Sequence, residues 1–389
     1  MINRNIRLLI SSYIKEFPVI AILGPRQVGK TTLVKTISQS LKKKTHYLDL
    51  EKTSDYEKLN RDPEEYLSTY KDECVLIDEV QRMPALFPLL RALVDEKRKP
   101  ARFIITGSAA PELLKDASES LAGRVYYFNL TPIGLHELPS NISLKKHWFR
   151  GGFPKPLTLK TNELVSAWLD AFITTYIERD LPFLFDVKFS PIVMRKLWGM
   201  LAHTHGNLLN AEQLGSSLGV TGTTVKRYLD YLEGAFLIKR LPPYFVNIGK
   251  RLVKSPKVYI NDSGILHHLL RIENEQELMS HPSVGPSWEG YVISQVIYAA
   301  PRRIDSYFYR TQVGAECDLV LVHGNSVKAC IEIKLSKSPV ATKGFYNTIA
   351  DLKSKNNFII CSADVDYKTA ENIIIVSLPI FISKYLPTL

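Results

Sequence analysis

Short runs of hydrophobic residues recur in the first third of the chain. Residues 17–23 form one run that ends at Gly24, and residues 74–77 form a second that ends at Asp78. Residues 102–106 form a third. A continuous apolar run of this length, bounded by turn residues, is typical of a parallel strand that is covered on both faces. The pattern therefore predicts a parallel α/β sheet in this part of the chain.

The middle of the chain has a helical periodicity. Residues 162–181 place apolar side chains three and four positions apart, which predicts an amphipathic helix that packs against the sheet domain. Its charged end, residues 178–180, is more typical of a salt-bridged contact between domains than of a catalytic site. Residues 210–218 and 223–233 then predict two helices joined by a tight turn, with Asn210 as the first N-cap. We therefore expect a helix-turn-helix.

The last third of the chain predicts a small sheet. Strand-like segments occupy residues 307–310, 316–322 and 329–335, and Gly324-Asn325 separates the second from the third. Glycine and asparagine favour a tight turn, so these two strands should form a hairpin.

Composition restricts the classes of protein. Hydrophobic residues at 45% and charged residues at 23% match ordinary folded domains. No apolar run approaches the roughly 18 residues that a membrane helix needs. The four cysteines, Cys74, Cys317, Cys330 and Cys361, are far apart and form no C-x-x-C pair, so they should be buried thiols. We therefore expect a cytoplasmic protein without a membrane anchor.

The net charge suggests a polyanionic partner. Lysine and arginine total 50 against 39 aspartate and glutamate residues, which gives a formal net charge of +11. Such an excess favours nucleic acid, because these side chains neutralise phosphates and release counterions. A solvated basic surface without a partner explains the same composition equally well.

The segment between the first predicted strand and a helix predicted over residues 30–41 has the pattern G-x-x-x-x-G-K-T. Its two glycines allow successive backbone N–H groups to wrap the phosphates of a nucleotide. Lys30 would reach the β- and γ-phosphates, and the Thr31 hydroxyl would bind Mg²⁺. The sequence therefore predicts a site for ATP and Mg²⁺. The predicted nucleotide-binding residues are Gly24, Pro25, Arg26, Gln27, Val28, Gly29, Lys30, Thr31 and Thr32.

Two carboxylates follow the second predicted strand, at the sheet edge where parallel α/β proteins bind ligands. We expect Asp78 to hold Mg²⁺, directly or through water, and Glu79 to orient the water that attacks the γ-phosphate. Ser108, after the third predicted strand, would present its hydroxyl near the γ-phosphate, and a simple turn is the alternative. Arg124 is a candidate arginine finger, which would require an oligomer if it acts in trans.

These motifs, GPRQVGKTTL, VLIDEVQ, ITGS and ESLAGR, resemble those of the AAA-type ATPases fused to an uncharacterised C-terminal domain, which are widespread in bacteria and archaea. The resemblance continues through residues 151–154 and 175–181 to the C-terminus, and residues 257–264, KVYINDSG, match a further signature of that family. It implies an architecture more than a biological role. One departure from standard AAA+ proteins is that the sequence shows no separate four-helix lid with a second sensor arginine.

Basic residues follow the predicted helix-turn-helix. Residues 236–257 contain six lysines and arginines and no acidic residue, with Tyr244 and Phe245 among them. This pattern predicts a basic wing beside a DNA-recognition helix, although winged helices also bind proteins. The candidate DNA contacts are Thr223, Thr224, Lys226, Arg227, Lys239, Arg240, Lys250 and Arg251.

Glu332 and Lys334 are two residues apart and so share one face of their strand, while Asp318 lies on the paired strand. This arrangement resembles the PD-(D/E)XK nuclease superfamily, and Glu289 fits the additional carboxylate of its preceding helix. The resemblance implies that Asp318 and Glu332 bind Mg²⁺ and that Lys334 holds or deprotonates the attacking water. The usual proline before the aspartate is absent. A buried salt bridge between Glu332 and Lys334 is the structural alternative.

The fold class we predict is α/β: a P-loop NTPase parallel sheet over residues 1–140, a helical and winged-helix domain over 141–270, and a restriction-endonuclease-like α/β domain over 271–389. Two functions remain open. One is an ATP-driven enzyme that acts on DNA through the wing and the nuclease-like site. The other is a nucleotide-switched signalling or scaffold ATPase with a protein partner and an inactive nuclease fold.

Overall fold

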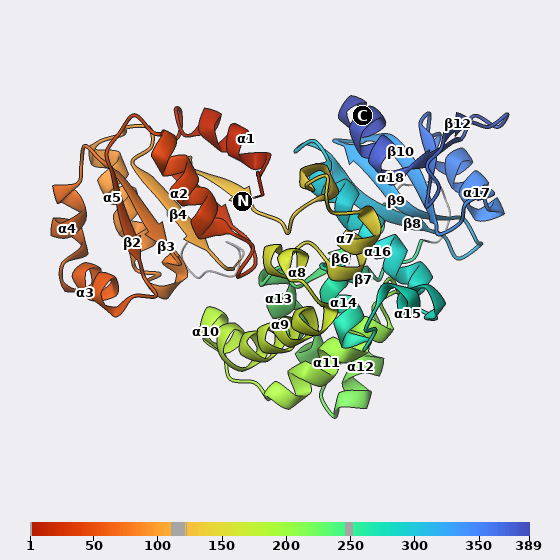
Figure 1. Cartoon of the computed structure of the whole chain (residues 1–389), viewed down its shortest axis with the longest axis horizontal. Coiled ribbons are helices and arrows are strands. Elements are labelled where there is room, and N and C mark those ends of the chain that lie inside the picture. Colours follow the sequence, from red (N-terminus) through yellow and green to blue (C-terminus); the bar gives the residue numbers. More distant parts are fainter. Residues whose placement is uncertain (1, 110–120, 122, 246–251) are drawn as a thin grey trace. The chain divides into compact units, whose positions relative to one another are not determined.

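A computed structural model describes residues 2–109, 121, 123–245 and 252–389 of the chain (Figure 1). The chain forms two compact units. Unit 1 comprises Met1–Ile133, Ile173–Phe189 and Asp230–Leu237, and unit 2 comprises Gly134–Phe172, Ser190–Leu229 and Ile238–Leu389.

Unit 1 contains a five-stranded sheet in its described residues, with the strand order β2-β3-β4-β1-β5 and every neighbouring pair parallel. The strands are β1 (Val19–Leu23), β2 (Thr45–Asp49), β3 (Cys74–Asp78), β4 (Phe103–Gly107) and β5 (Val125–Asn129). Strands β1, β3 and β4 are buried along their whole length, as continuous apolar runs require.

The strand register places the polar ends of three strands at one edge. Leu23 pairs with Gly107, and Ile77 pairs with Ile105, so the residues that follow these strands meet at the carboxyl edge of the sheet. Asp78 pairs with Asp49 at the same edge. Because a parallel α/β sheet binds ligands at this edge, the register itself positions the candidate site.

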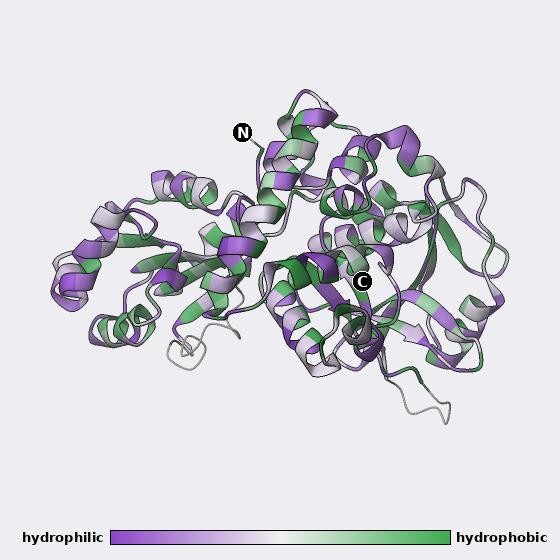
Figure 2. Cartoon of the chain, turned by 90° about the horizontal axis from the view of Figure 1, so that it is seen from below, coloured by the Kyte–Doolittle hydropathy of each residue, from purple (hydrophilic) through white to green (hydrophobic). Residues whose placement is uncertain are grey.

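Helices α1 and α2 pack on one face of this sheet, where Ile10, Val34 and Ile37 join Ile20 and Ile104 in one apolar core. Figure 1 shows α2 beside the strands. In Figure 2 the strands are mostly hydrophobic, whereas hydrophobic and hydrophilic residues alternate along the helices. The helical segments of unit 1 are α1 (Ile6–Tyr13), α2 (Lys30–Ser40), α3 (Thr53–Arg61), α4 (Pro63–Thr69), η1 (Val80–Arg82), α5 (Leu86–Glu96), η4 (Tyr176–Asp180) and α10 (Leu181–Phe185).

Unit 2 contains a mixed six-stranded sheet and a two-stranded sheet among its described residues. The larger sheet has the order β12-β13-β11-β10-β9-β8, and β6 pairs with β7 in the smaller one. The strands are β6 (Ile238–Leu241), β7 (Lys257–Ile260), β8 (Asp305–Arg310), β9 (Glu316–His323), β10 (Ser326–Lys334), β11 (Asn357–Cys361), β12 (Asp366–Lys368) and β13 (Ile374–Ser377). The antiparallel pairing of β9 with β10 confirms the predicted hairpin.

Helices make up most of the remainder of unit 2. They are η3 (Leu135–Glu137), α7 (Leu144–Arg150), α8 (Pro154–Thr158), α11 (Pro191–His203), α12 (Ala211–Leu218), α14 (Ser263–Leu269), α15 (Glu275–Ser280), α16 (Val284–Ala299), α17 (Lys343–Leu352), α18 (Leu378–Ile380), η5 (Phe381–Tyr385) and η6 (Leu386–Thr388). Helices α9 (Asn162–Thr175) and α13 (Gly222–Gly234) have residues in both units.

The long helix predicted over residues 162–181 differs from the structure at its C-terminal end. Helix α9 ends at Thr175, a π-helical turn occupies Tyr176–Asp180, and α10 then begins with Pro182 in its first turn. Proline has no N–H and cannot continue the regular i→i+4 hydrogen bonds of an α-helix. The turn before it has the wider i→i+5 spacing of a π-helix. This wide turn directs Tyr176 and Asp180 toward Arg26 of the P-loop.

The predicted fold class is confirmed, because a parallel P-loop NTPase sheet is followed by helices and a small mixed sheet. The helix-turn-helix segments lie where they were expected, with the Asn210 side chain accepting from the Gln213 N–H as the N-cap of α12. All four cysteines are buried. Within the described part of the chain, every helix is too short or too polar to cross a bilayer.

Candidate functional site

The P-loop follows β1 and turns on its two glycines. Gly24 has a φ of +155°, and a Cβ atom there would lie 2.2 Å from the backbone oxygen of Leu130. Gly29 has a φ of +102° and caps the N-terminus of α2. Both positions exclude a side chain, one by contact and one by backbone conformation. The sequence motif therefore forms a tight loop at the start of a helix, where backbone N–H groups favour anions.

Lys30 is the central cation of this loop. Its Nζ donates to the carbonyl oxygens of Gly24 and Pro25, both at 3.0 Å, and to Ser108 Oγ at 2.8 Å. Glu79 Oε1 lies 3.9 Å away. Burial lowers the pKa of Lys30, although Glu79 and Asp78 oppose that shift. The structure thus brings the predicted lysine, general base and serine together.

Three hydroxyl groups surround the carboxylate of Asp78 at the end of β3. Thr31 Oγ1 donates to Asp78 Oδ2 at 2.6 Å, and the Tyr47 hydroxyl donates to the same oxygen at 2.8 Å. The Thr106 hydroxyl donates to Oδ1. Burial, and then Asp78 itself, raise the pKa of Tyr47. Thr31 and Asp78 therefore form the hydroxyl and carboxylate pair that a P-loop magnesium site needs.

Glu79 adopts a left-handed backbone conformation, with a φ of +57°. Its carboxylate accepts from Ser108 Oγ at 3.0 Å and from the Gln81 side-chain amide, and its backbone N–H donates to Thr106 Oγ1 at 3.1 Å. A non-glycine residue in this conformation is uncommon and clusters at functional sites. The contacts hold the carboxylate beside Lys30 rather than along the strand.

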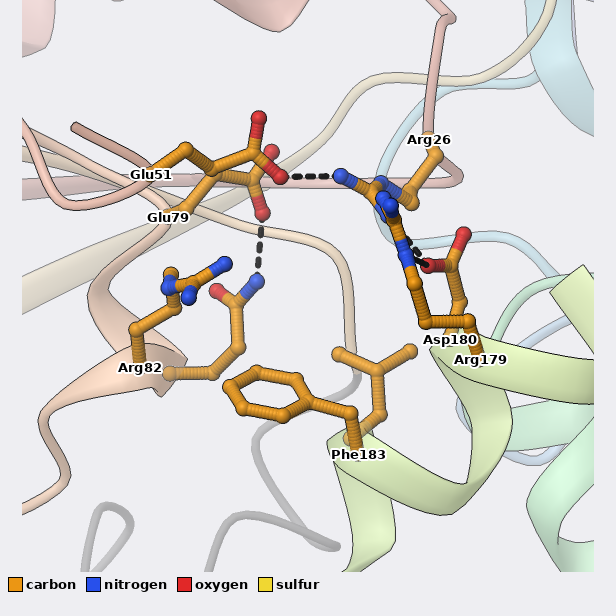
Figure 3. A pocket seen from close by; sticks show the side chains of 9 residues that line it. Arg26, Glu51, Glu79, Arg82, Arg179, Asp180 and Phe183 are labelled. Carbon is orange, nitrogen blue, oxygen red and sulfur yellow. Dashed lines mark hydrogen bonds and ion pairs between the residues drawn. The ribbon is translucent and has the colours of Figure 1, made fainter. Parts of the chain in front are cut away.

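A pocket of about 360 Å³ opens beside this group of residues in unit 1 (Figure 3). The Arg26 guanidinium lies between the carboxylates of Glu51 and Asp180 and forms an ion pair with each. The pocket is lined by Arg26, Glu51, Glu79, Gln81, Arg82, Arg179, Asp180, Phe183 and Leu184. The P-loop arginine is thus directed to side chains outside the loop.

The π-helical turn η4 contributes two of these neighbours. The Tyr176 hydroxyl accepts from the Arg26 backbone N–H at 3.4 Å and donates to the Ala235 carbonyl at 3.3 Å. Asp180 is buried and pairs with Arg26. The charged end of this helix was expected to form a salt-bridged contact rather than a catalytic site, and its Asp180 does form a salt bridge with the P-loop arginine. Both residues belong to unit 1.

The sequence did not indicate Tyr47, Thr106 or Glu51 as site residues, and it predicted a salt bridge for Asp180 rather than a place in the site. Thr106 is the last residue but one of β4, which precedes Ser108, so its place near the carboxyl edge was the one accessible signal. The other three come from β2, the loop after it and η4, and their side chains reach the site only through the fold.

Arg124 lies at the opposite edge of the sheet from the P-loop. It precedes β5, its carbonyl accepts from the Val19 N–H, and Val19 begins β1. Its Nε and Nη2 donate to the two carboxylate oxygens of Asp95 at 2.6 and 2.8 Å. Arg124 therefore does not reach the P-loop of its own unit, and a role in trans stays a prediction. Residues 119, 120 and 122 of its ESLAGR motif lie outside the described residues.

In unit 2, the nuclease-like residues divide into two groups. Lys334 Nζ lies 2.9 Å from Glu332 Oε1, and the Thr342 N–H donates to Glu332 Oε2 at 3.3 Å. Asp318 Oδ2 instead accepts from the Ile333 N–H at 2.9 Å. The salt bridge named as the structural alternative is thus present, with Glu332 buried and Lys334 only half-buried. Among the described residues, no three His, Cys, Asp or Glu side chains are arranged to hold a metal ion.

Glu289 and Asp318 share a different partner, Lys257. The Lys257 Nζ lies 3.2 Å from Glu289 Oε1, 3.8 Å from Asp318 Oδ1 and 3.7 Å from Glu316 Oε1. Only 4% of Lys257 is exposed. We expected this lysine to belong to the basic wing, and that expectation is wrong because its side chain is buried against carboxylates.

The candidate DNA contacts occupy α13 and β6. Thr223, Lys226 and Arg227 are exposed on α13, whereas the Thr224 hydroxyl is bonded to that of Thr221 at 3.0 Å. Lys239 and Arg240 are half-buried in β6, and the Lys239 ammonium lies 5.7 Å from the centre of the Tyr298 ring. Lys250 and Arg251 lie outside the described residues.

A parallel sheet, a P-loop and an acidic strand end define the class of P-loop nucleotide-binding proteins. The model of a family described as an AAA domain matches residues 16–138 of the chain. Two families described as domains of unknown function, DUF8612 and DUF4143, match residues 141–276 and 284–381. The N-terminal part is therefore an ATPase domain of the AAA type.

Uncharacterized proteins of Mycobacterium tuberculosis and Mycobacterium bovis are each 41% identical to the chain over 360 residues, which cover 92% of this chain and 80% of theirs. The chain belongs to the family of these mycobacterial proteins. An uncharacterized protein of Haemophilus influenzae is 24% identical over 211 residues, which are 50% of this chain and 52% of that protein.

Solved structures are similar to parts of the chain at lower identity. A Walker-type ATPase of Pyrococcus abyssi is 13% identical, with a TM-score of 0.47 over 69% of this chain and 96% of that one. The RuvB Holliday junction branch migration motor of Thermotoga maritima is 19% identical, with a TM-score of 0.33 over 62% of this chain and 90% of that one. At these scores the likeness supports no conclusion about DNA.

Proposed function

We propose that the chain binds ATP with Mg²⁺ at the P-loop of unit 1 and hydrolyses it. The observation that carries this proposal is the convergence of Lys30, Thr31, Asp78, Glu79 and Ser108 at the carboxyl edge of one parallel sheet. When bound, Mg²⁺ would neutralise charge on the phosphate oxygens, and Thr31 and Asp78 would hold it.

Glu79 is the general base in this proposal. Its carboxylate is held by Ser108 and Gln81 and lies beside the Lys30 ammonium, so it can accept a proton from a water molecule aligned with the γ-phosphate. Ser108 contacts both Lys30 and Glu79, and would fix the position of the base relative to the phosphate-binding lysine. Hydrolysis depends on this alignment, because the reaction requires positioning more than covalent help.

Two substitutions separate binding from hydrolysis. Lys30→Ala should lose ATP binding, whereas Glu79→Gln should bind ATP and lose turnover by roughly a hundredfold or more. Fluorescent-nucleotide titration and phosphate release measure the two properties. Lys71→Ala removes an exposed lysine of the same unit and serves as the charge-matched control. A Glu79→Gln chain that hydrolyses ATP at the parental rate would exclude Glu79 as the base.

We also propose that DNA is a partner of the chain, bound through α13 and the β6–β7 pair. Support comes from the exposed Thr223, Lys226 and Arg227 on the second helix of the helix-turn-helix, and from the formal net charge of +11. The division into an ATPase domain, a winged-helix domain and a C-terminal domain, with boundaries at residues 140 and 270, belongs to this proposal.

The DNA proposal predicts the response of ATP turnover to nucleic acid. Duplex, single-stranded or branched DNA should raise the ATPase rate, and the effect should fade steeply with salt because counterions are released on binding. The double substitution Lys226→Ala/Arg227→Ala should reduce the salt dependence of DNA binding. The slope of the logarithm of the binding constant against the logarithm of the salt concentration should become shallower by about 2, because two phosphates are then no longer neutralised. A rate that no nucleic acid changes would favour the signalling or scaffold function with a protein partner. Cleavage by unit 2 is not part of the proposal, because a salt bridge already occupies Glu332 and Lys334.

A further inference from the structure

Lys257 occupies the centre of the acidic cluster in unit 2. It enters from β7, and its Nζ is 3.2 to 3.8 Å from one oxygen each of Glu289 on α16 and of Glu316 and Asp318 on β9. The lysine is 4% exposed, and its ammonium lies 5.7 Å from the centre of the Phe308 ring. A buried ammonium group is stable only when anionic partners compensate the loss of water.

The surrounding contacts complete the compensation. Tyr259, two residues after Lys257 on the same face of β7, donates its hydroxyl to Glu289 Oε1 at 2.6 Å. Asp318 Oδ2 accepts from the Ile333 N–H at 2.9 Å, and Arg310 Nη1 lies 3.6 Å from Glu316 Oε1. Burial opposes the charge of Lys257, but Glu289, Asp318 and Glu316 raise its pKa above the ordinary value. The cluster therefore has its own cation.

A divalent metal does not fit beside this lysine. Mg²⁺ needs oxygen ligands at about 2.0–2.1 Å, and an ion bound to both Glu289 and Asp318 would repel an ammonium group placed between them. The remaining carboxylate of the nuclease-like pattern, Glu332, is paired with Lys334 at 2.9 Å. The carboxylates that the nuclease resemblance implies as metal ligands are thus paired with lysines: Glu289 and Asp318 with Lys257, and Glu332 with Lys334.

We propose that Lys257 is the resident cation of this cluster and that its ammonium group takes the place that a divalent metal occupies in the nuclease pattern. The cluster then fixes β7 to α16 and β9, and does not hydrolyse phosphodiesters by metal-assisted chemistry. The inference also accounts for the start of the KVYINDSG signature, because Lys257 and Tyr259 both contact Glu289. It is independent of the proposed ATPase function.

Mn²⁺ binding to the full chain without nucleotide tests the proposal, measured by electron paramagnetic resonance of the free ion. The parent chain and Asp318→Asn should bind Mn²⁺ equally, since Asp318 offers no metal site while Lys257 is present. Lys257→Met retains the unbranched side chain up to its last atom and removes the charge. It should gain a site at least about tenfold tighter than any in the parent, because a like charge within about 4 Å is gone.

Matched variants identify the new site. Lys257→Met/Asp318→Asn should lose the gained binding, and Lys257→Arg, which retains the charge, should not gain it. Mn²⁺ should also raise the melting temperature of Lys257→Met and leave that of the parent unchanged. Binding to the parent that Asp318→Asn abolishes would overturn the proposal, as would a folded Lys257→Met that gains no site. If Lys257→Met does not fold, the comparison of the parent with Asp318→Asn still decides.

Discussion

Asp78 receives three hydroxyl donors, and only one of them belongs to the P-loop. Thr31 is the expected partner, whereas Tyr47 comes from β2 and Thr106 from β4, on either side of the strand that ends at Asp78. Hydrogen bonds to a charged group fix its orientation more firmly than bonds between neutral groups. The flanking strands therefore orient the carboxylate that is expected to hold Mg²⁺.

Tyr47→Phe should weaken the binding of the Mg²⁺ that ATP turnover needs, while leaving the chain folded. The change removes one donor at 2.8 Å from Asp78 Oδ2 and retains the ring. Loss of one hydrogen bond to a carboxylate costs about 1.5–3 kcal/mol, which corresponds to roughly a tenfold or larger rise in the Mg²⁺ concentration needed for half-maximal rate. Titration of the ATPase rate with Mg²⁺ measures it.

Tyr66→Phe is the matched control for this substitution. The Tyr66 hydroxyl contacts His46 Nε2 at 3.0 Å, so its removal changes a tyrosine of the same unit without touching Asp78. Equal magnesium curves for Tyr47→Phe and the parent chain would show that the Tyr47 hydroxyl has no part in orienting Asp78.

Single residues differ in how far the sequence predicts them. Lys30, Thr31, Asp78 and Glu79 occupy short motifs with fixed spacing, and the structure brings these four together. Lys257 was wrongly assigned to the basic wing, because a lysine in a basic segment is usually solvated. Only the fold shows that it pairs with Glu289, some thirty residues later in sequence. Local spacing predicts residues within one loop, but it does not predict which distant side chains meet them.

At the scale of elements, the π-helical turn η4 links the P-loop to the helix that follows α9. Asp180 accepts from the Arg26 guanidinium on the side away from Glu51, and the Tyr176 hydroxyl contacts the Arg26 N–H. The two ion pairs differ in burial, because the side chain of Asp180 is 6% exposed and that of Glu51 is 43% exposed. Their contributions to stability should differ accordingly.

A double-mutant cycle separates the two pairs. Arg26→Gln and Asp180→Asn should show a coupling energy on the order of 1–3 kcal/mol in urea unfolding, because removal of one partner leaves a poorly solvated charge. The cycle of Arg26→Gln with Glu51→Gln should give less than about 1 kcal/mol, since water screens that pair. Equal coupling in both cycles would mean that η4 does not hold the P-loop through Asp180.

Element types were easier to predict than element ends. The strands of unit 1 were found because their residues are buried on both faces and so remain continuously apolar. The helix over residues 162–181 was too long, since its apolar period runs on through η4 and hides the change from α to π geometry. Periodicity records which face is buried, and it does not record the hydrogen-bond pattern that places Asp180.

At the scale of the whole molecule, unit 2 encloses ionisable groups whose charge is costly. Burial lowers the pKa of His205 to about 3 and that of His267 to about 4, and burial raises the pKa of Asp262 from 3.8 to about 6. His267 contacts the Phe149 carbonyl at 2.8 Å and Ser287 Oγ at 2.6 Å, and Asp262 caps α14. These groups make the stability of unit 2 dependent on pH.

The direction in which each group changes stability with pH depends on whether the folded or the unfolded chain binds its proton more tightly. Each histidine has a folded pKa below its ordinary 6.5, so its contribution to stability is present above pH 6.5 and is lost as the pH falls toward 4. Asp262 acts in the opposite sense, because its contribution is present below pH 3.8 and is lost as the pH rises through about 6. Between about pH 4 and 6 the unfolded chain binds two more protons at the histidines and one fewer at Asp262.

Taken together, these three groups bind one more proton in the unfolded chain than in the folded chain. The free energy of unfolding should therefore fall by roughly 1.4 kcal/mol for each pH unit of acidification. His267→Gln should abolish most of this slope, because the remaining His205 and Asp262 then cancel. Urea unfolding of the parent and of His267→Gln at several pH values between about 4 and 6 measures the difference in slope. His203→Gln, at an exposed position on α11, should retain the parental slope. A parental slope in His267→Gln would show that this histidine is protonated in the folded chain, since a group that titrates alike in both states contributes no pH dependence.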